Sequence, residues 1–315
     1  MNNSNANISH LVSIILCTYN GEKYVSQQLD SLVKQTYTNI EIIVVDDCST
    51  DNTFTILNDY KKQYSLITLI ENDSNIGYIK NFEKGMSVAK GFYLSPCDQD
   101  DMWDLQKIEK MVAEINEYPL IYCNSTLTNE TLMPLTTMAH KKNLATYNNC
   151  LVFATDNCIA GHATLLTKDL FTKAYPFPEN IPHDWWLAFV ASIHKGVKYI
   201  DEPLVLYRNH STNVIGAITT SKQKKAKGYK AQKKLLEIEK AKIRIAAFAN
   251  FCPSSLRHEK EVIQQLQSSY QSFSLANNIK RVQLYLRNRK LLLAIKKRPA
   301  WRKLIYCFKM FYQIR

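Results

Sequence analysis

The sequence predicts an α/β protein in which a mainly parallel sheet is flanked by helices and followed by a helical C-terminal extension. Continuous apolar runs of strand length alternate four times with longer amphipathic segments in the first part of the chain. Such runs are typical of parallel strands that are buried on both faces and connected by helices. The last part of the chain combines helical spacing of apolar residues with an excess of basic ones, which favours helices outside the sheet.

The strand and helix pattern is regular over the first four units. We expect strands and helices in strict alternation at residues 11–17, 22–35, 40–45, 51–64, 66–71, 78–90, 91–97 and 104–116. Beyond Pro119 the pattern weakens, and a polar stretch at 124–149 is expected to form a loop or a hairpin. Strand-like VKYID and PLVLYR follow, then a long basic helix at 221–249 and two or three helices broken near Pro253 and Pro299.

Polar residues stand at the end of each of the four predicted strands. They are TYN after the first strand, DDCSTD after the second, NIG after the third and DQDD after the fourth. The carboxyl ends of parallel strands meet at one edge of a sheet, where α/β proteins bind their ligands. The sequence therefore predicts one polar site at this edge.

The acidic run Asp98-Gln99-Asp100-Asp101 indicates a metal site. It follows an apolar strand directly, and residues two apart on an extended segment point to the same side. Carboxylates in this position can hold a hard cation such as Mg²⁺ or Mn²⁺, which bridges the two phosphates of a nucleotide sugar. The alternative is a solvated loop or a helix cap.

Several motifs in order resemble the inverting family 2 glycosyltransferases of the GT-A fold. They are VSIILCTYNGEKYVSQQLDSLVKQTYTNIEIIVVDDCSTDNT, NIGYIKNFEKG and DQDDMW, and the resemblance runs from about residue 11 to 216. DQDDMW together with the later HDWW and YRNH is most similar to bacterial rhamnosyltransferases that use dTDP-L-rhamnose. The resemblance implies a Rossmann-like GT-A domain at 1–220 and a basic helical extension at 221–315.

The resemblance also implies a donor site in the first two loops. Thr18 and Tyr19 would lie beside the nucleotide base, where the tyrosine ring can stack, although Tyr19 can also simply pack. Asp47 resembles the acid that accepts the pyrimidine N3 hydrogen, with Asp46 as its neighbour and possible substitute. Capping of the following turn and helix is an alternative role for Asp46.

Within the acidic run, Asp98 resembles a ribose or metal contact and Asp100 the metal ligand proper. Asp101 is expected to support a ligand or a sugar hydroxyl. Asn75 and Lys80 would border the donor, but their segment is shorter than the usual NxGxxxARN pattern.

A general base is expected at Asp184 in PHDWW, which stands at the place of the acid in the ED motif of the family. A carboxylate within hydrogen-bond reach of the acceptor hydroxyl can take its proton. The chain departs from the family in having His183 where glutamate is usual. The alternative is that Asp184 is the N-cap of the helix that follows.

Two further segments resemble site elements of the family. Arg208 and His210 match a segment that folds toward the phosphates and the metal, where neutral His210 would complete the set of ligands Asp98, Asp100 and His210. An ordinary surface turn is the alternative for this segment. Gly161 and His162 resemble a loop on the acceptor side.

The charge of the chain is concentrated at its C-terminal end. From Val262 to Arg315 there are 12 basic residues and no acidic one, which equals the net charge of +12 of the whole chain. Basic helices with a wide apolar face typically lie on anionic membranes, so we expect a membrane contact here and no nucleic-acid partner. An ordinary helical subdomain or an oligomer contact is the alternative.

The chain shows no apolar segment long enough for a signal peptide or a membrane span, so a cytoplasmic protein at the inner face of the cell membrane is expected. Eight cysteines without metal-ligand spacing are expected to be reduced core residues.

These observations together predict a metal-dependent, inverting transfer of a sugar onto a polyprenyl-linked oligosaccharide of a capsule, O-antigen or cell wall. The expected donor is dTDP-L-rhamnose, and the expected metal is Mn²⁺ or Mg²⁺. A UDP-hexose or UDP-N-acetylhexosamine donor is the first alternative. A noncatalytic scaffold subunit that binds a nucleotide sugar or a glycan is the alternative of another class.

Overall fold

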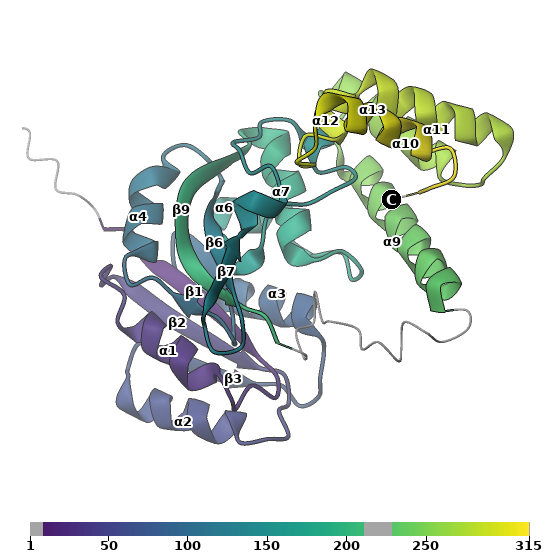
Figure 1. Ribbon diagram of the computed structural model, residues 1–315. Coiled ribbons are helices and arrows are strands. Elements are labelled where there is room, and N and C mark those ends of the chain that lie inside the picture. The colour runs from purple at the N-terminus through teal and green to yellow at the C-terminus, as the bar shows by residue number, and fades with distance from the viewer. Residues whose placement is uncertain (1–8, 211–228, 315) are drawn as a thin grey trace, which may run out of the picture.

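The computed structural model describes residues 9–210 and 229–314 (Figure 1). Within these residues nine strands form one mixed sheet in the order β3-β2-β1-β4-β8-β6-β9-β5, with β7 beside β6. Helices cover both faces of the sheet, and the C-terminal helices pack at one side of it. The predicted α/β fold with a helical C-terminal part is confirmed.

The first half of the sheet is the predicted parallel one. Its strands are β1 (Val12–Thr18), β2 (Ile40–Asp46), β3 (Ile67–Glu71) and β4 (Tyr93–Asp98), and their pairings with one another are all parallel. The helices between and after them are α1 (Val25–Val33), α2 (Thr53–Gln63), α3 (Tyr78–Val88) and α4 (Lys107–Ile115). All of β1 is buried, because helices lie on both faces, and this explains its continuous apolar sequence.

The second half of the sheet is largely antiparallel. Next to β4 lies β8 (Thr164–Thr167), followed by β6 (Leu120–Thr128), and both contacts are antiparallel. VKYID and PLVLYR form one strand, β9 (Val197–Arg208), parallel to β6, and β5 (Met102–Trp103) closes that edge. The predicted loop or hairpin is a hairpin, since β6 turns back into β7 (Pro134–Thr137) before α5 (Met138–Lys141).

The alternation of side chains along β1 divides the interior into two cores. Ile14 and Leu16 point to the face covered by α1 and α4, whereas Ile15 and Cys17 point to the face covered by α3. The second core also includes α6 (Lys168–Ala174) and α7 (His183–His194). All eight cysteines are free and seven are buried, as expected for small core residues.

The C-terminal helices share a core with the sheet domain. They are α9 (Tyr229–Phe251), α10 (Arg257–Ser269), α11 (Leu275–Arg287), α12 (Arg289–Leu292) and α13 (Ala300–Lys309). The Phe248 ring of α9 stacks on Phe189 of α7, with centroids 3.9 Å apart. In Figure 1, α10, α11, α12 and α13 form a compact group beyond α7 and α9. The predicted boundary at residue 220 and the start of the predicted helix at 221 lie outside the described residues.

Spanning a bilayer requires a helix that is both long and apolar, and none of the helices in the two described ranges meets that requirement.

Truncation of Phe248 should loosen the C-terminal helices from the sheet domain. Because the side chain is fully buried against α7, Phe248→Ala should cost about 3–5 kcal/mol of unfolding free energy. Urea denaturation followed by circular dichroism measures this loss. Leu235→Ala changes a residue of the same helix that is 65% exposed, and it should cost less than about 0.5 kcal/mol. Equal losses in the two variants would contradict the shared core.

Candidate functional site

The loops that follow β1, β2 and β4 meet at one edge of the sheet, as predicted. The pairing of Thr18 with Asp46, and of Cys17 with Asp98, puts the ends of these strands side by side. The side chain of Gln99 then joins two loops: its Oε1 accepts from Tyr19 N at 2.9 Å and its Nε2 donates to Tyr19 O at 3.0 Å. This amide holds the first loop beside the acidic run.

The two acids after β2 hold loops in place. Asp46 is fully buried and accepts bonds from Thr18 Oγ1 at 2.7 Å and from the backbone and hydroxyl of Ser49. Asp47 accepts from Asn72 Nδ2 at 2.8 Å and from the backbone N–H groups of Ile76 and Gly77, each at 2.9 Å. The N–H of a nucleotide base would therefore have to share the Asp47 carboxylate with the three donors that already bond to this carboxylate.

The other predicted donor residues border the same region. Tyr19 is 46% exposed, so its ring is accessible for stacking. Asn75 Oδ1 accepts from Gly77 N at 3.1 Å and shapes the turn before α3. Lys80 lies in α3 and pairs with Glu83 at 2.9 Å. A donor phosphate at Lys80 would thus compete with this ion pair.

A compact set of ligand atoms stands at the end of β4. Single atoms of Asp98, Asp101 and His162 all lie within 4.8 Å of one another. His162 Nδ1 is 3.3 Å from Asp98 Oδ2 and 3.4 Å from Asp101 Oδ2. Asp101 is fully buried, and its Oδ2 has no hydrogen-bond partner among the described residues. A buried, unbonded carboxylate oxygen beside a second carboxylate and an imidazole fits a divalent cation.

The pKa values within this set reflect burial and mutual charge. Burial raises the pKa of Asp101 well above its usual range, although the charge of His162 opposes this. For Asp98, burial is outweighed by the hydrogen bond and charge of His162, so its pKa is lowered. The pKa of His162 is raised by Asp101 and Asp98 against the effect of burial. Binding of a cation would favour carboxylates that are ionised and an imidazole that is neutral.

The predicted ligands Asp98, Asp100 and His210 fall into two neighbouring groups. Asp100 pairs with His210, whose Nε2 lies 2.7 Å from Asp100 Oδ2, whereas Asp98 lies against His162. Burial and the charge of Asp98 raise the pKa of Asp100. His162, which was expected on the acceptor side, contacts Asp98 and Asp101, because β8, which follows it, pairs directly with β4.

Arg208 is built into the wall of the site. Its Nε donates to Asp100 O at 2.8 Å, its Nη1 to Glu130 O at 2.6 Å, and its Nη2 to Gln27 Oε1 at 2.7 Å. The backbone N–H of Arg208 donates to Asp101 Oδ1 at 3.1 Å. The residue thereby anchors the end of β9 to the acidic run.

Asp184 lies in the first turn of α7, and the N-cap of that helix is Pro182, so the structure does not give Asp184 the alternative role of N-cap. Its Oδ1 accepts from Trp185 N at 2.6 Å. Burial raises the pKa of Asp184 to about 6. A carboxylate with such a pKa can act as a general base near neutral pH.

His183 lies in the same turn and is almost fully buried against Phe82, with ring centroids 4.1 Å apart. Neither ring nitrogen has a hydrogen-bond partner among the described residues. Burial lowers the pKa of His183 to about 4, so the ring is neutral near pH 7. A side chain at Gly161 would meet His183 Nε2 at 2.5 Å, which explains the glycine.

No pattern in the sequence indicated that a lysine would be buried beneath the site. Lys107 of α4 is fully buried, with its Nζ 3.0 Å from the centroid of Trp103 and 3.3 Å from Ser95 Oγ. Burial lowers the pKa of Lys107 to about 7, while Asp101 and Asp98 are among the charges that oppose this. In the sequence it resembles any lysine of an amphipathic helix.

Comparison with known proteins gives a family match. Residues 13–172 match the model described as Glycosyl transferase family 2. An uncharacterized glycosyltransferase of Haemophilus influenzae is 38% identical over 34% of this chain and 33% of its own. The putative teichuronic acid biosynthesis glycosyltransferase TuaG of Bacillus subtilis is 30% identical over 69% of this chain and 84% of its own. A beta-1,3-glucosyltransferase of Escherichia coli, WfgD, is 31% identical over 56% of this chain and 68% of its own.

The first relatives are matched over only part of their length, between 33% and 63%. Among solved structures, residues 1–349 of TarS from S. aureus with UDP-GlcNAc superpose with a TM-score of 0.58 at 18% identity, covering 96% of this chain and 90% of that one. The mannosyltransferase PcManGT of Pyrobaculum calidifontis, with GDP-Man and Mn²⁺, superposes with a TM-score of 0.53 at 15% identity, covering 96% of this chain and 86% of that one. These likenesses concern the fold.

Proposed function

Since this chain belongs to glycosyl transferase family 2, we propose that it transfers a sugar from a nucleoside diphosphate donor to a hydroxyl of a lipid-linked saccharide. The observation that carries the proposal is the group of buried carboxylates and imidazoles at the carboxyl end of β4. In an α/β fold this edge is where ligands bind. The reaction class is consistent with the glycosyltransferase names of the relatives TuaG and WfgD.

A divalent cation, Mn²⁺ or Mg²⁺, would be held by Asp98 with Asp101 and His162, or with Asp100 and His210. The mannosyltransferase PcManGT, which has a similar fold, was solved in complex with GDP-Man and Mn²⁺. When bound, the cation neutralises the diphosphate and stabilises the charge that develops as it leaves. The unbonded Asp101 Oδ2 supports the first set of ligands.

Residues of this chain would hold the donor and the acceptor in line. Tyr19 would stack on the base, and Thr18, Asp46 and Asp47 would shape that pocket from the buried side. Asn75 and Lys80 would border the donor from the turn and helix after β3, and Arg208 would act by fixing the position of the acidic run.

Asp184 would take the proton of the acceptor hydroxyl as that oxygen attacks the anomeric carbon. A single displacement of this kind inverts the anomeric configuration, and it requires no covalent nucleophile. The pKa of about 6 leaves most of the carboxylate ionised at pH 7, so the base is ready to accept a proton.

Two donors are candidates. The motifs DQDDMW, HDWW and YRNH favour dTDP-L-rhamnose, because they are most similar to rhamnosyltransferases. The relative WfgD, which uses UDP-Glc, and the UDP-GlcNAc complex of TarS favour a UDP-hexose or UDP-N-acetylhexosamine. Both kinds of donor share the base and diphosphate contacts, so they differ only in the pocket for the sugar.

The acceptor proposed here is a polyprenyl-linked saccharide, and WfgD is named for an acceptor on diphosphoundecaprenol. Such an acceptor lies in a membrane, and α13 carries a matching surface. Trp301, Leu304, Ile305 and Phe308 are all more than 40% exposed on this helix. Basic residues adjoin them, which suits anionic headgroups. The protein would act at the inner face of the cell membrane.

The purified protein should turn over one donor of a panel containing dTDP-L-rhamnose, UDP-glucose and UDP-GlcNAc with Mn²⁺. Release of the nucleoside diphosphate measures turnover, which EDTA should abolish and added Mn²⁺ restore. Asp98→Asn and Asp101→Asn should each lower kcat/KM by about 100-fold or more, because ligands of the cation are lost.

The control is Asp59→Asn, which removes the same charge from an exposed residue of α2. It should leave kcat/KM within about twofold of the wild-type value. If no donor is turned over, and the Asp98 and Asp101 variants remain functional in cells, the noncatalytic scaffold hypothesis would replace this one.

Asp184→Asn should lower kcat for sugar transfer by about 10²–10⁴-fold. The wild-type kcat/KM should fall about tenfold per pH unit below pH 6, because a base works only when ionised, above its pKa of about 6. Since burial disfavours the charged form, the variant should be at least as stable as the wild type in thermal denaturation. The control Asp169→Asn, in the first turn of the neighbouring helix α6, should leave kcat unchanged. Equal losses of kcat in the Asp169 and Asp184 variants would exclude Asp184 as the general base.

Trp301→Ser with Phe308→Ser should weaken binding to vesicles that contain phosphatidylglycerol by about tenfold or more, because two exposed rings no longer enter the interface. Flotation of the protein with vesicles measures the binding. Leu135→Ser alters a side chain on β7 that is 64% exposed, and it should bind like the wild type. Binding that is unaffected by the double substitution would refute the membrane role of α13.

A further inference from the structure

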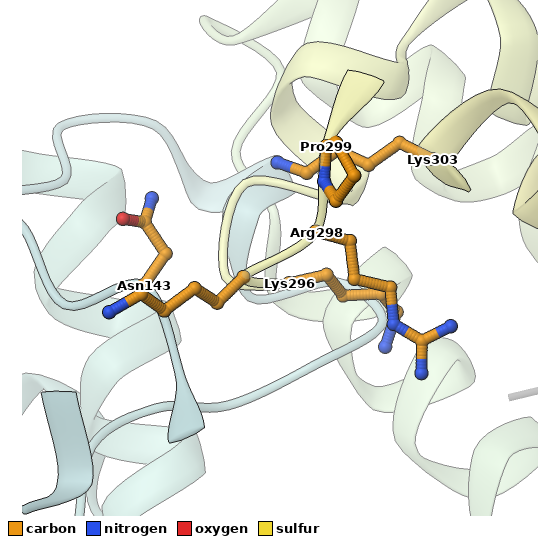
Figure 2. Close-up of a pocket in the computed structure, with 6 residues that line it drawn as sticks. Asn143, Lys296, Arg298, Pro299 and Lys303 are labelled. Carbon is orange, nitrogen blue, oxygen red and sulfur yellow. The ribbon is translucent and has the colours of Figure 1, made fainter. Parts of the chain in front are cut away.

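A basic pocket lies where the C-terminal segment returns to the sheet domain. It has a volume of about 350 Å³ and is lined by Asn143, Lys296, Lys297, Arg298, Pro299 and Lys303. Figure 2 shows that Asn143 comes from the loop after α5, whereas the other side chains come from the turn before α13 and from α13 itself. Four of the six lining residues are cations, and none is an acid.

Part of this positive charge has no counter-ion. Lys296 pairs with Asp156 at 2.8 Å, and Lys297 Nζ donates to Ala139 O at 2.7 Å. Within the described ranges, no carboxylate lies within ion-pair distance of Arg298 or Lys303. Lys303 is half-buried, and burial lowers its pKa. A hollow with two uncompensated cations is suited to a multiply charged anion.

One segment of the chain connects the basic pocket with the acidic site. Asp156, the partner of Lys296, also lies 3.5 Å from Lys142. Burial raises the pKa of Asp184, and the charge of Lys142 is near enough to oppose that effect. Asp156 lies six positions before His162, so their Cα atoms are at most about 20 Å apart. The segment between them thus joins the wall of the pocket to the acidic site.

Helix α13 begins at the basic pocket and ends at a second, apolar pocket. A second hollow of about 350 Å³ is lined by Ile279, Val282, Gln283, Phe308, Phe311 and Tyr312. It lies at the C-terminal end of α13, whose 10 residues span about 15 Å. One end of the helix thus offers cations and the other offers apolar side chains, which matches an anionic head attached to a hydrocarbon chain.

We propose that the basic pocket binds the diphosphate of the lipid-linked acceptor, with the prenyl chain lying along α13 toward the apolar pocket. The assignment of the ligand as an acceptor rests on the proposed function. Arg298 and Lys303 contact the phosphate oxygens, while Lys296 and Lys297 hold the segment against the sheet domain. The site selects for a diphosphate joined to an isoprenoid chain.

Binding of farnesyl diphosphate, measured by calorimetry in EDTA without donor, tests the site directly. Without a divalent cation the acidic run repels phosphate, so the signal comes from the basic pocket. Arg298→Gln with Lys303→Gln should weaken binding about tenfold. Arg287→Gln with Lys290→Gln removes two exposed cations outside the pocket and should change affinity less than twofold.

Three outcomes would overturn the proposal. Equal losses in the two double variants would mean that only net charge matters. Inorganic pyrophosphate binding as tightly as farnesyl diphosphate would mean that the isoprenoid chain is not recognised. A pocket variant that binds phosphatidylglycerol vesicles as poorly as it binds farnesyl diphosphate would make the pocket a contact for phospholipid headgroups.

Kinetics separate this inference from the proposed function. In a wild type that turns over a donor, the pocket variant should raise KM for a polyprenyl diphosphate-linked saccharide about tenfold and leave KM for the donor unchanged. An unchanged acceptor KM would refute the pocket while sustaining the transferase. Absence of donor turnover in the wild type would refute the transferase, whereas the calorimetric result would still stand.

Discussion

The fully buried carboxylate of Asp101 is the constraint around which this end of the sheet is organised. A carboxyl group taken from water costs free energy unless other groups compensate it, and burial raises the pKa of Asp101 well above its usual range. Here the compensation comes from separate parts of the chain: the backbone N–H of Arg208 at the end of β9, the imidazole of His162 before β8, and the charge of Lys107 in α4. These contacts hold the end of β9 and the segment before β8 against the end of β4.

Polar side chains likewise fix the loops that follow β1 and β2. Gln99 ties the first loop to the acidic run, and Asp46 ties it to the loop after β2. Each of these bonds joins segments at least 28 residues apart. Asp47 does the same for the turn at Gly77, whose φ of +81° suits glycine. Asp47, which resembles the contact of a nucleotide base, is thus also a structural acceptor, and a base N–H would have to share its oxygens with these donors.

The sequence was sufficient for the parts of the fold that are encoded locally. The four strand and helix units were predictable because their burial on both faces produces unbroken apolar runs, and Asp98, Asp100 and Asp101 follow from their place after such a run. The contact of His162 with Asp98 could not be predicted from the sequence, because it depends on antiparallel pairing between β4 and β8. These strands lie about 70 residues apart in the sequence. Lys107 was missed for a similar reason: only the packed structure reveals that α4 turns this lysine inward. The division of the predicted metal ligands into two groups likewise depends on tertiary contacts.

The basic C-terminal part illustrates how composition alone overstates a surface charge. Arg281 is fully buried, where its guanidinium bonds to Met310 O at 3.1 Å and to Ser272 O at 2.9 Å, so it holds α11 against the end of the chain and contributes nothing to a membrane contact. Lys296 is likewise used in an ion pair. Bases that remain exposed include Arg289 and Lys290 of α12 and Arg302 and Lys309 of α13, and the last two lie on the same helix as the exposed apolar residues of α13. Because α9 and α11 bury Phe248 and Tyr285 in the same core as the sheet domain, a membrane contact at α13 would fix the orientation of the whole molecule relative to the lipid.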